Sequence, residues 1–211
     1  MISRRDLLCA GALAPLSTYS FAAPAYKAGK EYLTVHPMAP TPADKIEVVE
    51  FFAYTCPHCL QFHPVFHEWA QKAPEDVSIR ICPVAWQPKY LPFTDTYFAL
   101  EALGLLDSLS MPFFESIIYQ TRSYNFDSAT RDIHDFMVGV DGAKWDATFN
   151  SFGVKNKSRN ATMLWNAYQI DSTPMVGVGG KFTTGPHLAG SRQGTPAVID
   201  YLVDQMRTLR K

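Results

Sequence analysis

The sequence predicts an α/β fold in which an all-helical domain is inserted into a small sheet domain. Two observations support this prediction. Over residues 46–84 a buried strand, a helix and a second strand follow one another, which is the order of a βαβ unit with parallel strands and a right-handed crossover. Over residues 88–160 the apolar residues recur at intervals of three and four, which is typical of packed helices. We therefore expect a sheet domain formed by residues 23–87 and 162–211, interrupted by a helical domain of residues 88–161.

The sheet domain begins with a lead-in rich in Ala, Pro and Lys, in which residues 32–35 are expected to form a short strand at a sheet edge. Residues 46–53 are a near-continuous run of β-branched and aromatic residues, as in a central strand covered on both faces. A helix is predicted next, because apolar side chains recur at helical spacing at Phe62, Val65, Phe66 and Trp69. A second strand is expected over residues 77–84.

The helical domain is predicted from four apolar groups, which lie at residues 93–100, 113–118, 133–140 and 145–152. We expect short helices there, separated by Gly104, Pro112, Asn125 and Gly139. A further helical stretch is predicted over residues 161–168.

The last part of the chain returns to the sheet. Strands are predicted over residues 175–178 and 181–183, joined by a Gly-Gly turn of the kind that favours a hairpin. A helix over residues 195–210 closes the chain, with Pro196 suited to its first turn.

The first 22 residues read as a cleaved export signal. Arg4 and Arg5 form a basic start, a short apolar run follows, and small residues precede a cleavage site after Ala22 or Ala23. The run is too short to anchor the protein in a bilayer. The paired arginines also resemble a twin-arginine signal, so that route and the general one both stay open. Cys9 leaves with the signal, and we expect the mature protein to be exported into an oxidising environment.

Composition excludes several classes of function. The net charge is −1, with 18% charged residues, so neither nucleic acid nor an anionic membrane surface is expected as a partner. No Gly-rich phosphate loop is present. Four cysteines are too few for a disulfide scaffold of this length, and two of them form the motif Cys56-Pro57-His58-Cys59.

This motif stands where the central strand turns into a helix, and it predicts reversible disulfide chemistry. Cys56 is expected near the helix N-terminus, where unpaired N–H groups and the helix dipole stabilise a thiolate. His58 can add positive charge or a hydrogen bond to the same sulfur. Cys56 is then the exposed, attacked sulfur and Cys59 the buried partner.

The motif has two other interpretations. A structural disulfide is possible at this spacing. Zinc binding is the more specific alternative, because the spacing of Cys56, Cys59, His63 and His67 resembles that of zinc ligands. Against it, the sequence has no second cysteine pair. We expect no bound metal.

The chain resembles the DsbA family of bacterial periplasmic thiol:disulfide oxidoreductases, which belong to the thioredoxin superfamily. The resemblance rests on residues 50–59 (EFFAYTCPHC), on the helical insertion and on Thr173-Pro174, and it covers almost the whole mature chain. It implies a thioredoxin-like fold with an inserted helical domain. It also implies a reaction without a bound cofactor, because the disulfide itself carries the two electrons.

Three further residues have roles that only the resemblance implies. Pro174 matches the cis-proline that faces the active-site disulfide, which would leave the backbone around Thr173 free to pair with an extended substrate. Threonine before this proline is a departure, because the best-known members carry valine there, whereas threonine is similar to the disulfide isomerases. Glu50 interrupts an apolar strand, where a buried carboxylate is costly unless it has a role or a partner. By the resemblance it matches an acid thought to help proton movement at the buried cysteine, and Ile81 stands where relatives have that acid's basic partner.

The predicted function is oxidation of cysteine pairs in newly exported, unfolded proteins, followed by reoxidation by a quinone-linked membrane partner of the DsbB type. An isomerase or reductant of the same superfamily is one alternative, and an exported zinc-binding or thiol-capturing module is another. We expect a monomer. Cys82 is expected to be a small core residue, and the histidines other than His58 are given no role.

Overall fold

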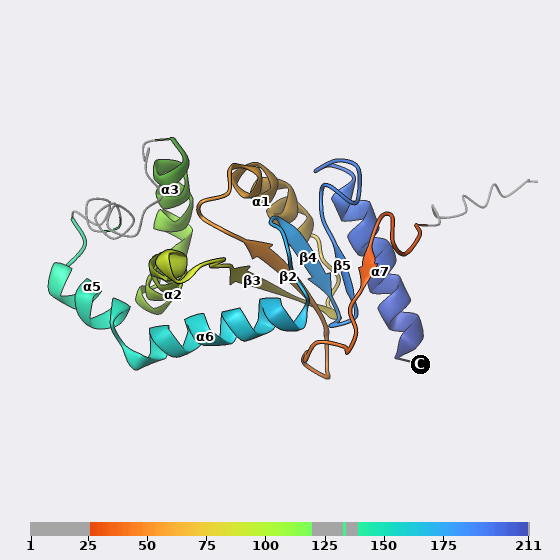
Figure 1. Cartoon of the computed structure of the whole chain (residues 1–211), viewed down its shortest axis with the longest axis horizontal. Helices are drawn as coiled ribbons and strands as arrows, with labels where there is room; N and C mark the ends of the chain where they lie inside the picture. Colours follow the sequence, from red (N-terminus) through yellow and green to blue (C-terminus); the bar gives the residue numbers. More distant parts are fainter. Residues whose placement is uncertain (1–25, 120–132, 134–138, 211) are drawn as a thin grey trace, which may run out of the picture.

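The computed structural model describes residues 26–119, 133 and 139–210 (Figure 1). Its centre is a five-stranded sheet in the order β1-β5-β4-β2-β3. β2 and β3 are parallel, whereas β4 runs antiparallel to both β2 and β5. β1 pairs with β5 at the far edge, which confirms the short edge strand expected from the sequence. The strands span Leu33–Thr34 (β1), Ile46–Phe52 (β2), Val77–Pro83 (β3), Met175–Val178 (β4) and Phe182–Thr184 (β5).

Helices cover both faces of this sheet, as the fully buried strand β2 requires. On one face the apolar side chains of α1 (Pro57–Ala70) and α7 (Thr195–Leu209) pack against Val48 and Val178. On the other face α6 (Phe152–Ala167) leads into Tyr168, whose ring lies 5.2 Å from that of Phe51. Alternate residues of β2 therefore face different helices.

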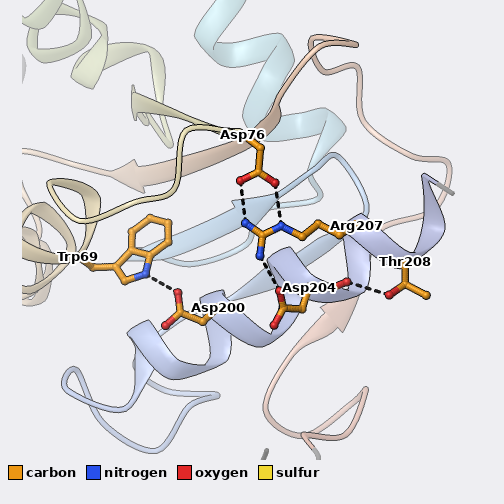
Figure 2. Close-up of polar contacts among 6 residues, drawn as sticks. All are labelled: Trp69, Asp76, Asp200, Asp204, Arg207 and Thr208. Carbon is orange, nitrogen blue, oxygen red and sulfur yellow. Dashed lines mark hydrogen bonds and ion pairs between the residues drawn. The ribbon is translucent and has the colours of Figure 1, made fainter.

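Polar contacts fix α7 against its neighbours (Figure 2). Arg207 donates from Nε and Nη2 to the two carboxylate oxygens of Asp76, each at 2.7 Å, and from Nη1 to Asp204. Trp69 of α1 donates its indole N–H to Asp200 at 2.8 Å. These groups are partly exposed, so each contact contributes little energy. They hold α7 beside α1 and the turn that leads into β3.

The helical insertion lies beyond the β3 edge of the sheet (Figure 1). A single 3-10 turn precedes its helices. An aromatic cluster joins it to the sheet domain, since the ring of Tyr54, just after β2, lies 4.8 Å from Phe113 and 5.2 Å from Phe114. The Tyr54 hydroxyl also bonds Ser110 at 2.7 Å. Among the described residues the insertion contains α2 (Leu91–Leu103), α3 (Leu106–Tyr119), α5 (Gly142–Phe149) and the start of α6, with the 3-10 turn at Pro88–Tyr90.

Two expectations about the insertion were wrong. Pro112 lies inside α3 and does not separate two helices. Burial of Phe113, Phe114 and Ile117 around it offsets the lost backbone hydrogen bond. Residues 161–168 are not a separate stretch either, because α6 begins after the Ser151 cap and runs on to Ala167. It thereby crosses the boundary expected between residues 161 and 162.

Other expectations lie outside the described residues. These are the export signal, Asn125 as a break, and most of the apolar group at residues 133–140. Among the described residues no helix combines the length and the hydrophobicity needed to cross a membrane.

Candidate active site

The Cys-Pro-His-Cys motif lies at the carboxyl end of β2, where the chain enters α1. Cys56 is the N-cap residue with an extended backbone, and Pro57 occupies the first turn, where a missing N–H costs no helix bond. Cys56 is partly exposed and His58 is exposed, whereas Cys59 is fully buried. The structure thus separates the two sulfurs by access to solvent, in the order expected from the sequence.

The two thiols also differ in acidity. A hydrogen bond from the Cys59 side chain is the main cause that lowers the pKa of Cys56 to about 6, against the opposing effect of burial. The backbone N–H groups of Cys59 and His58 lower it further. With this pKa about 90% of Cys56 is thiolate at pH 7. His58 thus acts on the sulfur through its backbone, and a role for its imidazole stays a prediction.

Cys59 behaves in the opposite way. Burial is the main cause that raises the pKa of Cys59 far above its ordinary value, and its shared hydrogen bond with Cys56 and the negative charge there raise it further. Cys59 therefore remains a thiol at neutral pH whenever the pair is reduced. Such a pair combines a stable leaving thiolate with a partner that must gain and lose a proton.

Thr173 and Pro174 lie against the exposed sulfur. The predicted cis bond between them is confirmed. The Cys56 sulfur lies 3.4 Å from the carbonyl oxygen of Thr173, to which it donates when it is protonated. A cleft of about 460 Å³ opens here, lined by His58, Ser172, Thr173, Pro174, Pro186, His187, Ser191 and Arg192. An extended substrate has room beside Cys56 in this cleft.

Glu50 lies on β2 with its side chain completely buried. Its Oε2 lies 2.7 Å from Nδ1 of His63, while Oε1 has no hydrogen-bond partner among the described residues. Ile81 is its register partner in β3, as expected, and supplies no charge. Burial opposes protonation of His63, but the charge of Glu50 and the hydrogen bond to it outweigh burial and raise the pKa of His63.

His63 is a site residue that the sequence does not single out from the other histidines. The available signal was its spacing. His63 follows Cys59 by four positions on the same helix, which places both side chains on one face. That face is turned toward the strand that carries Glu50.

The structure also bears on Cys82 and on the alternative of zinc binding. Cys82 is buried in β3, and burial raises the pKa of its thiol to about 12, which confirms the expected core residue. In the part of the chain that the structure describes, no three His, Cys, Asp or Glu side chains gather as metal ligands would. His63, one of the four residues with zinc-like spacing, bonds Glu50.

Comparison with known proteins adds three findings on sequence. The thioredoxin family model matches residues 39–89. The thiol:disulfide interchange protein DsbA of Bordetella parapertussis is 38% identical over 205 residues, which cover 95% of this chain and 96% of that protein. The protein of the same name from Pseudomonas aeruginosa is 32% identical over 212 residues, which cover 98% and 99% of the two chains.

Solved structures are similar as well. The crystal structure of Pseudomonas aeruginosa DsbA superposes with a TM-score of 0.79 at 32% identity, covering 87% of this chain and 96% of that one. The oxidoreductase NmDsbA1 from Neisseria meningitidis gives a TM-score of 0.74 at 27% identity, covering 87% and 95%. The similarity therefore extends over the sheet and the helical insertion together.

Proposed function

The chain belongs to the DsbA family of thiol:disulfide interchange proteins, and from this premise we propose that Cys56 and Cys59 donate their disulfide to cysteine pairs of other proteins. The observation that carries the proposal is the unequal pair of thiols. Cys56 has a pKa of about 6 and is accessible, while Cys59 is buried with a raised pKa. A disulfide between them is readily opened at Cys56, because the thiolate formed on reduction is stabilised there.

The reaction has two steps. A substrate thiolate attacks Cys56, the Cys56–Cys59 bond breaks, and a mixed disulfide between substrate and Cys56 forms while Cys59 takes the electron pair and a proton. A second substrate thiolate then attacks the substrate sulfur of the mixed disulfide and releases Cys56 as thiolate. The substrate has lost two electrons and two protons, the enzyme has gained the two electrons, and Cys59 has gained one proton.

Substrate binding is assigned to the backbone at Thr173 and to Pro174. The Thr173 carbonyl lies next to the attacked sulfur, at the entrance to β4 and beside the open cleft. A substrate segment in extended conformation can pair with this backbone as an added strand. Such pairing recognises main chain and not sequence, which suits an enzyme that acts on many unfolded proteins.

The cellular setting follows from the same premise. We propose that residues 1–22 direct export to the periplasm and are removed, by the general or the twin-arginine route. The substrates are unfolded exported proteins with free thiols, and a quinone-linked membrane protein of the DsbB type reoxidises the pair. The protein acts as a monomer, and no bound cofactor is needed because the disulfide carries the electrons.

The test is equilibration of the purified protein with glutathione redox buffers, together with oxidation of a dithiol peptide. We expect an oxidising potential and stoichiometric conversion of the peptide. A potential near that of thioredoxin, roughly −270 mV, would contradict the proposal and favour a reductant. Faster reshuffling of a wrongly paired disulfide than oxidation of a dithiol would favour the isomerase to which Thr173 points.

A further inference from the structure

Cys59 has to gain and lose a proton in each reaction cycle, and the two thiols do not supply that proton themselves. Each time its disulfide is opened Cys59 takes up a proton, and each time the disulfide is restored it gives that proton back. Its sulfur is fully buried, so bulk water does not reach it directly. A chain of titratable groups from the buried sulfur to solvent would satisfy this demand.

Glu50 and His63 supply two titratable groups for such a path. Cys59 and His63 lie one turn apart on the same face of α1, and His63 Nδ1 lies 2.7 Å from Glu50 Oε2. Glu50 is completely buried, and its second oxygen, Oε1, has no hydrogen-bond partner among the described residues. A buried carboxylate oxygen without a partner is costly unless it serves an exchange that a static structure does not record.

His63 connects this buried pair to solvent. Its side chain is 24% exposed, and it lines an open groove of about 700 Å³ between α1, β3 and the helices of the insertion. The other titratable groups on this groove are His67 on α1, Tyr97 on α2 and Asp107 on α3. β3 contributes only the apolar Ile79 and Ile81 to it. A groove of this size admits water, so protons can reach the imidazole from outside.

We propose that His63 carries the proton of Cys59 between water in this groove and Glu50. This role rests on the proposed redox function of Cys56 and Cys59. During substrate oxidation water protonates the imidazole, the imidazole protonates Glu50, and Glu50 delivers the proton to the Cys59 sulfur as the disulfide opens. During reoxidation the same proton leaves by the reverse path. His63 does not touch the reacting sulfurs and acts through Glu50.

The test compares His63→Gln with His67→Gln as a matched control. His67 lies one turn further along the same helix, lines the same groove, and bonds Gln71 through its ring. The measurement is stopped-flow oxidation of a dithiol peptide between pH 5 and 8, with the thiolate absorbance of Cys56 followed in parallel. We expect His63→Gln to lower the rate roughly tenfold and to flatten its pH dependence, less than the full effect of a general acid because water replaces part of the relay.

Chemical rescue separates a relay from a purely structural role. Free imidazole should restore the rate of His63→Ala through the open groove, with the Cys56 titration unchanged in both variants. Rates of His63→Gln equal to those of His67→Gln would overturn the proposal. Uniform slowing with an unchanged pH profile and no imidazole rescue would overturn it too, because it shows that His63 only supports the structure.

A second variant keeps the test decisive if His63→Gln is unstable. In a Glu50→Gln background the replacement of His63 should slow the reaction no further, since the relay is already broken. Independent, multiplying effects of the two replacements would contradict it. Failure of the wild-type protein to oxidise the peptide at any pH would instead contradict the proposed function, and is thus distinguishable.

Discussion

The two faces of the central sheet each bury a glutamate and a cysteine, with very different consequences. Toward α1, Glu50 bonds His63, which lies one helical turn from Cys59. Toward α6, Glu47 lies 3.6 Å from Arg80, and Cys82 is directed to the Ala161 carbonyl of α6 at 3.7 Å. Both carboxylates have one oxygen without a partner in the part of the chain described, so burial and missing partners do not distinguish them.

The basic partner distinguishes the two glutamates. A guanidinium remains protonated at every pH that the protein tolerates, so Arg80 can only hold its charge beside Glu47. Burial raises the pKa of Glu47, and the positive charge of Arg80 opposes this. An imidazole exchanges its proton near neutrality, so the His63 pair can change state during a reaction. One face is thus a static support, and the other can move protons.

The largest expected effect contrasts the buried cysteines of the two faces. Replacing Cys59 by alanine removes the disulfide and should abolish dithiol oxidation, as should Cys56→Ala. Cys82→Ala should leave the rate within twofold and lower the free energy of unfolding by about 1 kcal/mol, since it removes one buried sulfur. Peptide oxidation and urea denaturation measure the two effects. Loss of activity in folded Cys82→Ala would show that this face takes part in the chemistry.

The next largest effect contrasts the two glutamates. Glu50→Gln keeps the shape of the side chain but removes a proton carrier, so the oxidation rate should fall roughly tenfold or more near neutral pH. Glu47→Gln should leave the rate unchanged, because its partner Arg80 does not exchange protons. Stopped-flow peptide oxidation by both variants measures this difference. Equal rates for the two variants would remove the functional distinction between the faces.

This contrast shows where sequence reasoning succeeds. The parallel strands were predictable from their apolar runs, and the role of Cys56 from its place at a helix start, because both depend on local pattern. The cis bond at Pro174 was predictable only through the family resemblance. Glu50 was noticed since a carboxylate interrupts an apolar strand.

The same contrast shows what the sequence could not reveal. The importance of His63 arises from its contact with Glu50, which lies on a different element, β2. A separation of 13 residues in the sequence does not predict such a contact. Pro112 lies inside a helix and α6 begins well before residue 161, because tertiary packing overrides local helix propensity. The pairing of Glu47 with Arg80 likewise depends on strand register, which is set by the assembled sheet.

A smaller effect concerns the pH dependence of stability in the reduced protein. The pKa of Cys56 is about 6 in the folded state against an ordinary value of 9.0, so its thiolate stabilises the fold above pH 9 and this stabilisation is lost as the pH falls through 6. The difference in urea midpoint between the reduced wild type and Cys56→Ala should therefore grow from pH 6 to 9. A constant difference would show that the Cys56 thiolate is not stabilised.

The raised pKa of His63 gives stability the opposite dependence on pH. The contribution of His63 is present below pH 6.5 and is lost as the pH rises through its raised folded pKa. Cys56→Ala, which lacks the thiolate, should therefore lose stability as the pH rises above 6.5. Cys82 does not contribute below pH 9, because its folded pKa is about 12. The slope of this variant thus reports the His63 contribution without that of the Cys56 thiolate.

The smallest expected effect is that of breaking the ion pair between Glu47 and Arg80. The Arg80 side chain is 44% exposed, so solvent screens its attraction to Glu47, and Arg80→Gln should lower the free energy of unfolding by at most about 1 kcal/mol. The oxidation rate and its pH profile should match the wild type. A double-mutant cycle with Glu47→Gln in urea measures the coupling of the pair. Because the same kind of replacement at His63 is expected to change the rate and its pH profile, a pH profile in Arg80→Gln that differs from that of the wild type would mean that protons also move through the α6 face.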